Sequence, residues 1–256
     1  MPGRCSPPIP ERSDECARIA FTSVPVSDPG AGCTTMPRGL SITRKSEAKQ
    51  EKAAGAPGDA SNVVIWLKPV DHSGAEVASA EPERKRMQLV QRNKSFQPHL
   101  LVVPVGSVVD FPNRDPFFHN VFSLVDGKRF DLGLYEAGAT NSVHFDRVGV
   151  SFLFCNIHPE MSAIVVAVDT PYYAVSNRAG SVTIANVPDG KYEMHIWYER
   201  SVAEDLQGLT RTVAISSATR ELGTVDVPEN PSFSLAHKNK YGQEYTPPPK
   251  QGYPHP

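Results

Sequence analysis

The sequence predicts an all-β fold made of two β-sandwiches, with disordered segments at both ends. Short runs of β-branched and aromatic residues recur from residue 63 to residue 227, and such runs are typical of strands. Turn-forming pairs such as Asp126-Gly127 and Ala137-Gly138 separate them. No segment has the periodicity of a convincing amphipathic helix. Many short strands with regular turns indicate a sandwich or a barrel.

The first sandwich is expected to span residues 61–169. It opens abruptly with the apolar run VVIWL at 63–67. Residues 141–145 alternate in polarity, whereas 164–168 are continuously apolar, as in a strand buried on both faces. The expected strands cover 63–67, 100–103, 107–111, 120–124, 141–145, 150–154 and 164–168.

A second, smaller sandwich is expected over residues 170–228. Pro188-Asp189-Gly190 supplies a turn between two of its strands. Its expected strands cover 172–175, 181–184, 192–198, 212–215 and 222–227.

The two ends of the chain differ from its middle in composition. The 24 prolines cluster at the ends, and residues 1–60 are rich in Pro, Gly, Ser and Ala. We therefore expect a disordered head and linker over 1–60 and a Pro-rich tail over 229–256.

The bulk properties exclude several classes of partner. A formal net charge of -2 disfavours nucleic acid or an anionic membrane as the main partner. No run of about 18 apolar residues is present, so no transmembrane segment is expected. The N-terminus shows no basic start followed by an apolar stretch, so no signal peptide is visible. The oligomeric state is not predicted.

Four cysteines divide between the head and the folded region. Cys5, Cys16 and Cys33 lie in the head and form no CxxC pair. Export would allow a disulfide between two of them, and the simpler interpretation is unstructured thiols without a role. Cys155 stands alone in the folded region, so its role depends on its neighbours.

The segment FCNIHPEM at 154–161 places a thiolate, an imidazole and a thioether at C-x-x-H-x-x-M spacing. The loop lies between two apolar strands and can turn Cys155, His158 and Met161 toward one point. His119, at the start of another strand, supplies a fourth ligand. Two His and one Cys with a weak axial Met form the type 1 copper site of electron-transfer proteins. The simpler alternatives are a buried structural thiol, a core methionine and a surface histidine.

Each residue type suits copper in both oxidation states. The soft thiolate holds Cu(I) and gives Cu(II) strong covalency, the imidazoles suit both states, and a distant thioether modulates the potential. A site adequate for both states needs little rearrangement when the electron moves.

The segments VVDFPNRDPFFHNVFSL and FCNIHPEMSAIVVAV resemble the plastocyanin/amicyanin family of blue copper proteins over roughly residues 62–169. The resemblance implies a cupredoxin-like Greek-key β-sandwich that binds one type 1 copper ion. It implies His119, Cys155 and His158 as equatorial ligands, Met161 as the axial ligand and His158 as the electron exit. It also implies that Asn120, outside the ligand set, ties its strand to the Cys loop. The polar insertion between Val70 and Met87 and the extra β unit depart from a minimal cupredoxin.

The segment AGSVTIANVPDGKYEMHIW at 179–197 resembles the carboxypeptidase regulatory-like, transthyretin-type β-sandwich. Val182 stands where that family usually has an aromatic residue. This resemblance implies a fold and no chemistry.

The predicted function is electron transfer through copper cycling between Cu(I) and Cu(II), without enzymatic activity. No HxH pair or His triad offers a second, type 2 copper site, which argues against a copper nitrite reductase or oxidase. Redox partner proteins are expected to dock near His158, and the family resemblance implies a periplasmic or extracellular location. The alternative is an exported structural or binding module in which copper is incidental. Asp110 and Asp115 are interpreted as turn residues.

Overall fold

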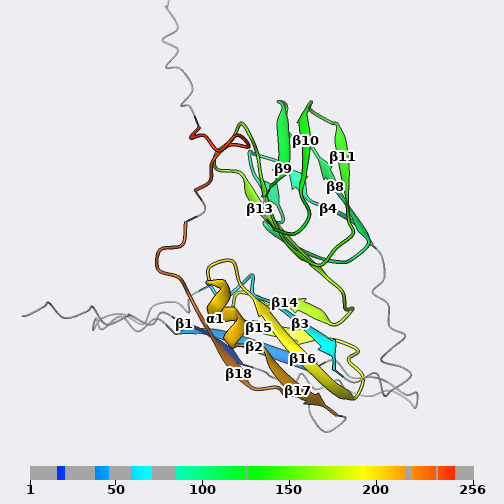
Figure 1. Cartoon of the computed structure of the whole chain (residues 1–256), viewed down its shortest axis with the longest axis vertical. Helices are drawn as coiled ribbons and strands as arrows, with labels where there is room; N and C mark the ends of the chain where they lie inside the picture. The colour runs from blue at the N-terminus through cyan, green and yellow to red at the C-terminus, as the bar shows by residue number, and fades with distance from the viewer. Residues whose placement is uncertain are drawn as a thin grey trace, which may run out of the picture. The chain divides into compact units, whose positions relative to one another are not determined.

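The computed structural model describes residues 16–20, 38–45, 59–70, 85–124, 126–216, 221–234 and 236–245. The chain forms two compact units. The central unit comprises Ala75–Tyr173 and Ser234–Pro256, and the flanking unit comprises Met1–Gly74 and Ala174–Phe233. The predicted all-β class is confirmed, because strands arranged in sheets form both units (Figure 1).

The central unit contains a five-stranded sheet, a three-stranded sheet and a two-stranded ribbon. In the larger sheet β7 and β13 are parallel neighbours, whereas β13, β12, β9 and β10 pair antiparallel. In order across the sheets, the strands are β10 (Phe130–Tyr135), β9 (His119–Ser123), β12 (Gly149–Phe154), β13 (Ser162–Val168) and β7 (Leu100–Pro104); β11 (Thr140–Phe145), β8 (Ser107–Pro112) and β4 (Arg86–Gln88); and β5 (Val90–Gln91) with β6 (Phe96–Gln97).

One apolar core fills the central unit. The alternating residues of β11 bury Val143 and Phe145, and the continuously apolar β13 is buried along nearly its whole length, as its sequence predicts. The same core cluster contains Cys155 and Met161. These two candidate ligands are therefore part of the packed interior, which fixes their positions.

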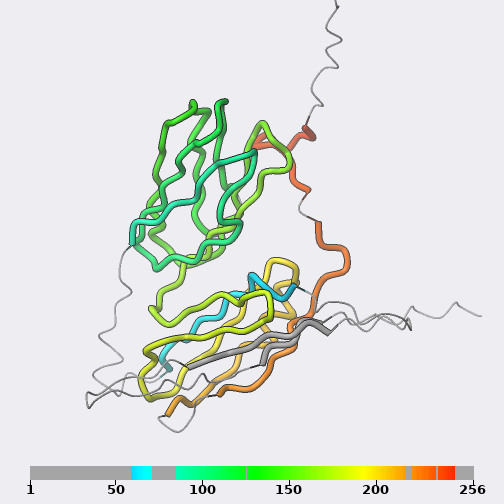
Figure 2. Tube along the Cα trace, turned by 180° about the vertical axis from the view of Figure 1, so that it is seen from behind, coloured from blue at the N-terminus to red at the C-terminus, as the bar shows by residue number. Residues whose placement is uncertain are grey.

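The flanking unit contains two four-stranded sheets. In one sheet the order is β15 (Ser181–Ile184), β2 (Arg38–Lys45), β1 (Cys16–Ala20) and β18 (Thr224–Pro228). In the other sheet the order is β14 (Tyr173–Val175), β3 (Val64–Pro69), β16 (Gly190–Trp197) and β17 (Arg211–Ile215). Figure 2 shows the trace of the chain from behind. The unit also holds the short helix α1 (Ala203–Gly208). Among the described residues, no helix is long and apolar enough to cross a membrane.

The observed units differ from the predicted boundaries at residues 61 and 169. Strand β3, expected in the first sandwich, pairs antiparallel with β16, with Val64 opposite Trp197. The apolar run at 63–67 predicts a strand, but only the register with β16 decides which sheet receives it. The expected disordered head also contains β1 and β2, which pair with each other and with β18 and β15.

The rest of the predicted terminal disorder lies outside the described residues, as do Cys5 and Cys33. The tail differs as well, because residues 234–245 belong to the central unit. In the regulatory-like segment, Val182, Ile184, Val187 and Tyr192 are buried. The Tyr192 hydroxyl donates a hydrogen bond to the Pro188 carbonyl oxygen at 3.0 Å. The family resemblance of this segment stays a prediction.

Candidate metal centre

Two segments carry the predicted ligands, and strand pairing brings them together. His119 begins β9, and Phe154 at the end of β12 pairs with Phe122 of β9. The loop between β12 and β13 then carries the other three. Its Cys155 N–H donates to the Met161 carbonyl at 3.2 Å, and the Met161 N–H donates to the His158 carbonyl at 3.1 Å. These two bonds fold the loop back on itself.

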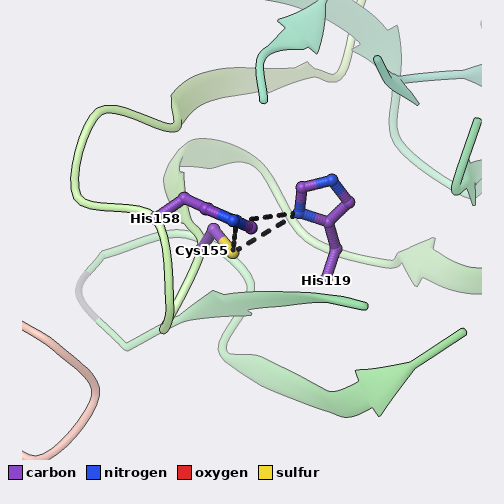
Figure 3. Close-up of side chains that lie close together, drawn as sticks. All are labelled: His119, Cys155 and His158. Carbon is purple, nitrogen blue, oxygen red and sulfur yellow. Dashed lines mark hydrogen bonds between the residues drawn. The ribbon is translucent and has the colours of Figure 1, made fainter. Parts of the chain in front are cut away.

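Three donor atoms converge in the interior. The Cys155 Sγ lies 3.8 Å from His119 Nδ1 and 3.5 Å from His158 Nδ1, and the two nitrogens are 3.1 Å apart. Figure 3 shows the three side chains pointing toward one another. Within the described residues, this is the group of His, Cys and acidic side chains whose spacing could hold a metal ion.

The triangle of donor atoms has the size that a metal ion requires. A circle through three points with these separations has a radius of about 2.0 Å, close to the roughly 2.0–2.3 Å of metal bonds to imidazole nitrogen and thiolate sulfur. An ion at its centre would be bound to all three atoms in a trigonal plane. Two imidazoles and one thiolate in that plane suit copper of type 1.

Met161 is fully buried in the same core cluster as Cys155. It is the last residue of the loop between β12 and β13. The assignment of Met161 as the axial ligand stays a prediction.

Burial and local dipoles act in opposite directions on the Cys155 thiol. Burial raises its pKa above the ordinary value, and the charge of Glu160 adds to that rise. The backbone N–H groups of Asn120, Ile157 and His158 oppose it. Such N–H groups stabilise the negative charge of a thiolate. They would therefore act together with a bound metal ion to keep the Cys155 sulfur deprotonated.

Asp115 orients the imidazole of His119, a role that the interpretation as a turn residue missed. The His119 Nε2–H donates to the Asp115 carboxylate at 2.8 Å, and both side chains are almost wholly buried. With the proton on Nε2, the lone pair of Nδ1 faces the other two donor atoms. A carboxylate behind a ligating histidine fixes its tautomer and raises its basicity.

Backbone donors hold Asp115 in its charged form. The N–H groups of Asn93 and Lys94 donate to its carboxylate at 2.6 and 2.9 Å. Burial disfavours the charged form, but these two bonds and His119 outweigh it and lower the Asp115 pKa. The Asp115 N–H in turn donates to Asn113 Oδ1 at 3.0 Å. Asp115 therefore belongs to a connected buried network.

The second imidazole is more accessible than the first. His158 is half-buried, whereas His119 is fully buried. Burial lowers the His158 pKa, and His119 lowers it further, which keeps the ring neutral and able to bind metal. The ring of Phe117 lies 5.2 Å from that of His119 and 5.5 Å from that of His158, measured between centroids.

Asn120 connects its strand to the Cys loop through its backbone N–H, which reaches toward the sulfur of Cys155. Its role beside a bound metal ion stays a prediction. The side-chain amide instead donates to Asp131 Oδ1 at 2.7 Å and to the Gly133 carbonyl at 2.9 Å. The amide thus ties β9 to β10 because the register places Asn120 opposite Leu134.

Several solved structures are similar to part of this chain. A purple cupredoxin from Nitrosopumilus maritimus is 24% identical over 32% of this chain and 99% of its own, with a TM-score of 0.30. A copper-containing nitrite reductase from Thermus scotoductus is 26% identical over 40% of this chain and 25% of its own, with a TM-score of 0.32. An amicyanin variant in its Cu(I) form is 17% identical over 42% and 99%, with a TM-score of 0.31.

No protein-family model matches the chain, and no curated protein sequence matches it. At TM-scores of 0.30 to 0.32, the structural similarities carry no conclusion about its function. The metal centre therefore rests on its own geometry and donor chemistry.

Proposed function

We propose that this protein transfers electrons through one type 1 copper ion held by His119, Cys155, His158 and Met161. The observation that carries the proposal is the triangle of two imidazole nitrogens and one sulfur, which fits a single ion. Bound copper would supply one-electron chemistry by cycling between Cu(I) and Cu(II).

The protein's own contribution is a rigid donor set. Asp115 keeps the His119 lone pair directed at the metal position, and the packed core keeps Cys155 and Met161 in place. A donor set that moves little is suited to both oxidation states, so little rearrangement accompanies the electron.

We propose that redox partners dock beside His158. That residue is the more accessible imidazole, and the neighbouring Ile157 is 42% exposed. Phe118, which precedes His119 in the sequence, is 55% exposed. Exposed apolar side chains adjacent to ligands in the sequence suit brief, low-affinity contacts between electron-transfer proteins.

The proposal describes a carrier and not an enzyme. Two imidazoles, one thiolate and one thioether are the donor set typical of copper sites that transfer electrons. The family resemblance supports a periplasmic or extracellular location, which we propose on that basis.

Rapid mixing tests the transfer of electrons. The full-length protein would be loaded with copper, reduced, and mixed with a small-molecule one-electron oxidant. We expect a visible band to appear in one step, with one electron lost per copper, and to disappear on reduction through repeated cycles. Copper that is lost in the first cycle, or that does not change oxidation state, would refute a carrier function.

Thermal unfolding separates a carrier from a module in which copper is incidental. A site built for copper binds the folded state, so one equivalent should raise the midpoint strongly. The Cys155→Ser variant should show a much smaller rise. Equal midpoints with and without copper would favour an exported structural or binding module.

A further inference from the structure

The C-terminal residues 236–245, termed the return segment, lie against the metal-binding loop. The chain leaves the central unit at Tyr173, forms β15 to β18 of the flanking unit, and re-enters the central unit at Ser234. Figures 1 and 2 both draw this segment, coloured orange to red, beside the loop between β12 and β13, and hydrogen bonds join the two.

Two hydrogen bonds attach the return segment to consecutive residues at the metal position. The Tyr245 hydroxyl donates to the backbone carbonyl of Cys155 at 2.6 Å. The Lys240 backbone N–H donates to Asn156 Oδ1 at 3.0 Å. The first bond therefore acts directly on the backbone of the proposed thiolate ligand.

The Lys240 side chain extends the attachment to the strand that carries His119. Its Nζ lies 2.7 Å from Asp131 Oδ2, and the other oxygen of Asp131 accepts the Asn120 amide at 2.7 Å. Asn120 also directs its backbone N–H toward the Cys155 sulfur. Lys240, Asp131 and Asn120 thus connect the return segment to both segments of the site.

Aromatic packing completes the contact. The His237 ring stacks on Phe154, the residue before Cys155, with centroids 4.2 Å apart and planes at 25°. The Tyr245 ring meets the edge of His237 at 5.4 Å. Such pairs stabilise contacts beyond the apolar area that they bury.

A tight turn preorganises the return segment. The Asn239 Oδ1 accepts the N–H groups of Tyr241 and Gln243 at 2.9 and 3.0 Å. Gly242 has a φ of 76°, which suits glycine. The turn sets the spacing between Lys240 and Tyr245, so both reach the loop at once.

We propose that the return segment is part of the metal centre, with Tyr245 and Lys240 as positioning residues that hold the Cys155–Asn156 backbone and thereby set the copper release rate and the reduction potential. This role rests on the proposed copper function. Hydrogen bonds around metal ligands commonly tune both properties. A hydrogen bond to the Cys155 carbonyl and the positive charge of Lys240 beside Asp131 both favour the reduced site, which carries more negative charge. Their removal should therefore lower the potential.

The test compares Tyr245→Phe and Lys240→Met with matched controls in the full-length protein. Tyr241→Phe removes the hydroxyl of a tyrosine in the same segment that is 71% exposed, and it keeps the ring, whose centroid lies 5.4 Å from Lys240 Nζ. Lys238→Met removes a cation whose partner is the exposed Glu244. Alkylation of Cys155 in the copper-free protein, resolved by peptide mass spectrometry, measures opening of the loop. Copper transfer to a chelator and the reduction potential measure the loaded site.

We expect Tyr245→Phe to accelerate both Cys155 alkylation and copper release about fivefold, the effect of losing one hydrogen bond. Its potential and that of Lys240→Met should fall, and both controls should match the wild type. If the wild type binds copper normally, but Tyr245→Phe and Lys240→Met match their controls in alkylation, copper release and reduction potential, this role alone would be overturned. A wild-type protein that takes up no copper would overturn the proposed function and this role together.

Discussion

The two segments that form the metal centre are held by different means. Strand β9 begins with His119, whose imidazole is fixed by the buried carboxylate of Asp115, which also accepts two backbone N–H groups. The loop after β12 carries His158, which is half-buried and follows a cysteine anchored by core packing and the return segment. The imidazole of His119 is thus held by Asp115 on the side away from the metal position. The imidazole of His158 lies near the surface, where an electron can leave.

This difference separates two requirements of a carrier. The buried network restrains the geometry, because a buried carboxylate with several donors moves little. The looser histidine gives access, because a partner can approach it without opening the core. The following changes break one requirement at a time.

The largest effect is expected when either imidazole is removed. The two variants should differ in whether added imidazole restores the copper site. His119→Gly and His158→Gly should both lose the visible band of the copper-loaded protein. Added imidazole should restore the band in His158→Gly, because that position is accessible, but not in His119→Gly. Absorption titrations with imidazole measure this. Equal rescue of the two variants would contradict the difference in access.

A smaller effect is expected when the locked imidazole loses its charged partner. Asp115→Asn keeps the shape of the side chain but removes the charge behind His119, and should weaken copper binding about 10- to 100-fold. Competition with a chelator measures the affinity. The control is Asp110→Asn, since that buried carboxylate bonds Arg86 and Ser142 instead of a candidate ligand. Equal copper affinities in the two variants would remove the proposed role of Asp115.

The smallest expected effect is the pH dependence of the stability that the Lys240–Asp131 pair contributes. Burial acts to raise the Asp131 pKa, but hydrogen bonds from Lys240, Gly133 and Asn120 outweigh it and lower the pKa. A lowered folded-state pKa means that the pair stabilises the protein above the ordinary carboxyl value of about 3.9. That stabilisation is lost as the pH falls through the folded value.

At about pH 6, copper-free wild type should therefore exceed Lys240→Met by about 0.5–1 kcal/mol in the free energy of unfolding. The difference should shrink as the pH falls through the folded-state pKa of Asp131. Urea unfolding, monitored by hydrogen exchange on peptides of the central unit, measures this difference in the free energy of unfolding. Lys238→Met is the control. A difference that persists unchanged in acid would show that the pair is not its cause.

Local spacing allowed the candidate metal centre to be proposed from the sequence. Cys155, His158 and Met161 lie within one short loop, so their C-x-x-H-x-x-M spacing already limits how far apart they can be. His119 could be added because it begins a β-branched, aromatic strand. The structure brings His119, Cys155 and His158 together.

Features that depend on contacts formed only in the folded chain could not be predicted from the sequence in the same way. Asp115 has a sufficient local reason to exist in a turn, and only the fold shows that it bonds His119. The pairing of β3 with β16 joins segments more than a hundred residues apart. The polar composition of residues 236–245 resembles a loose tail, although aromatic stacking and two hydrogen bonds attach it to the loop.

The central claim is that Cys155 binds Cu(II) as a thiolate in a trigonal site with His119 and His158. Titration of the copper-free protein with Cu(II), followed by visible absorption, tests it most directly. We expect an intense charge-transfer band that saturates at one equivalent, disappears on reduction and is absent from Cys155→Ser. A colourless Cu(II) complex, or a band that survives in Cys155→Ser, would contradict the claim.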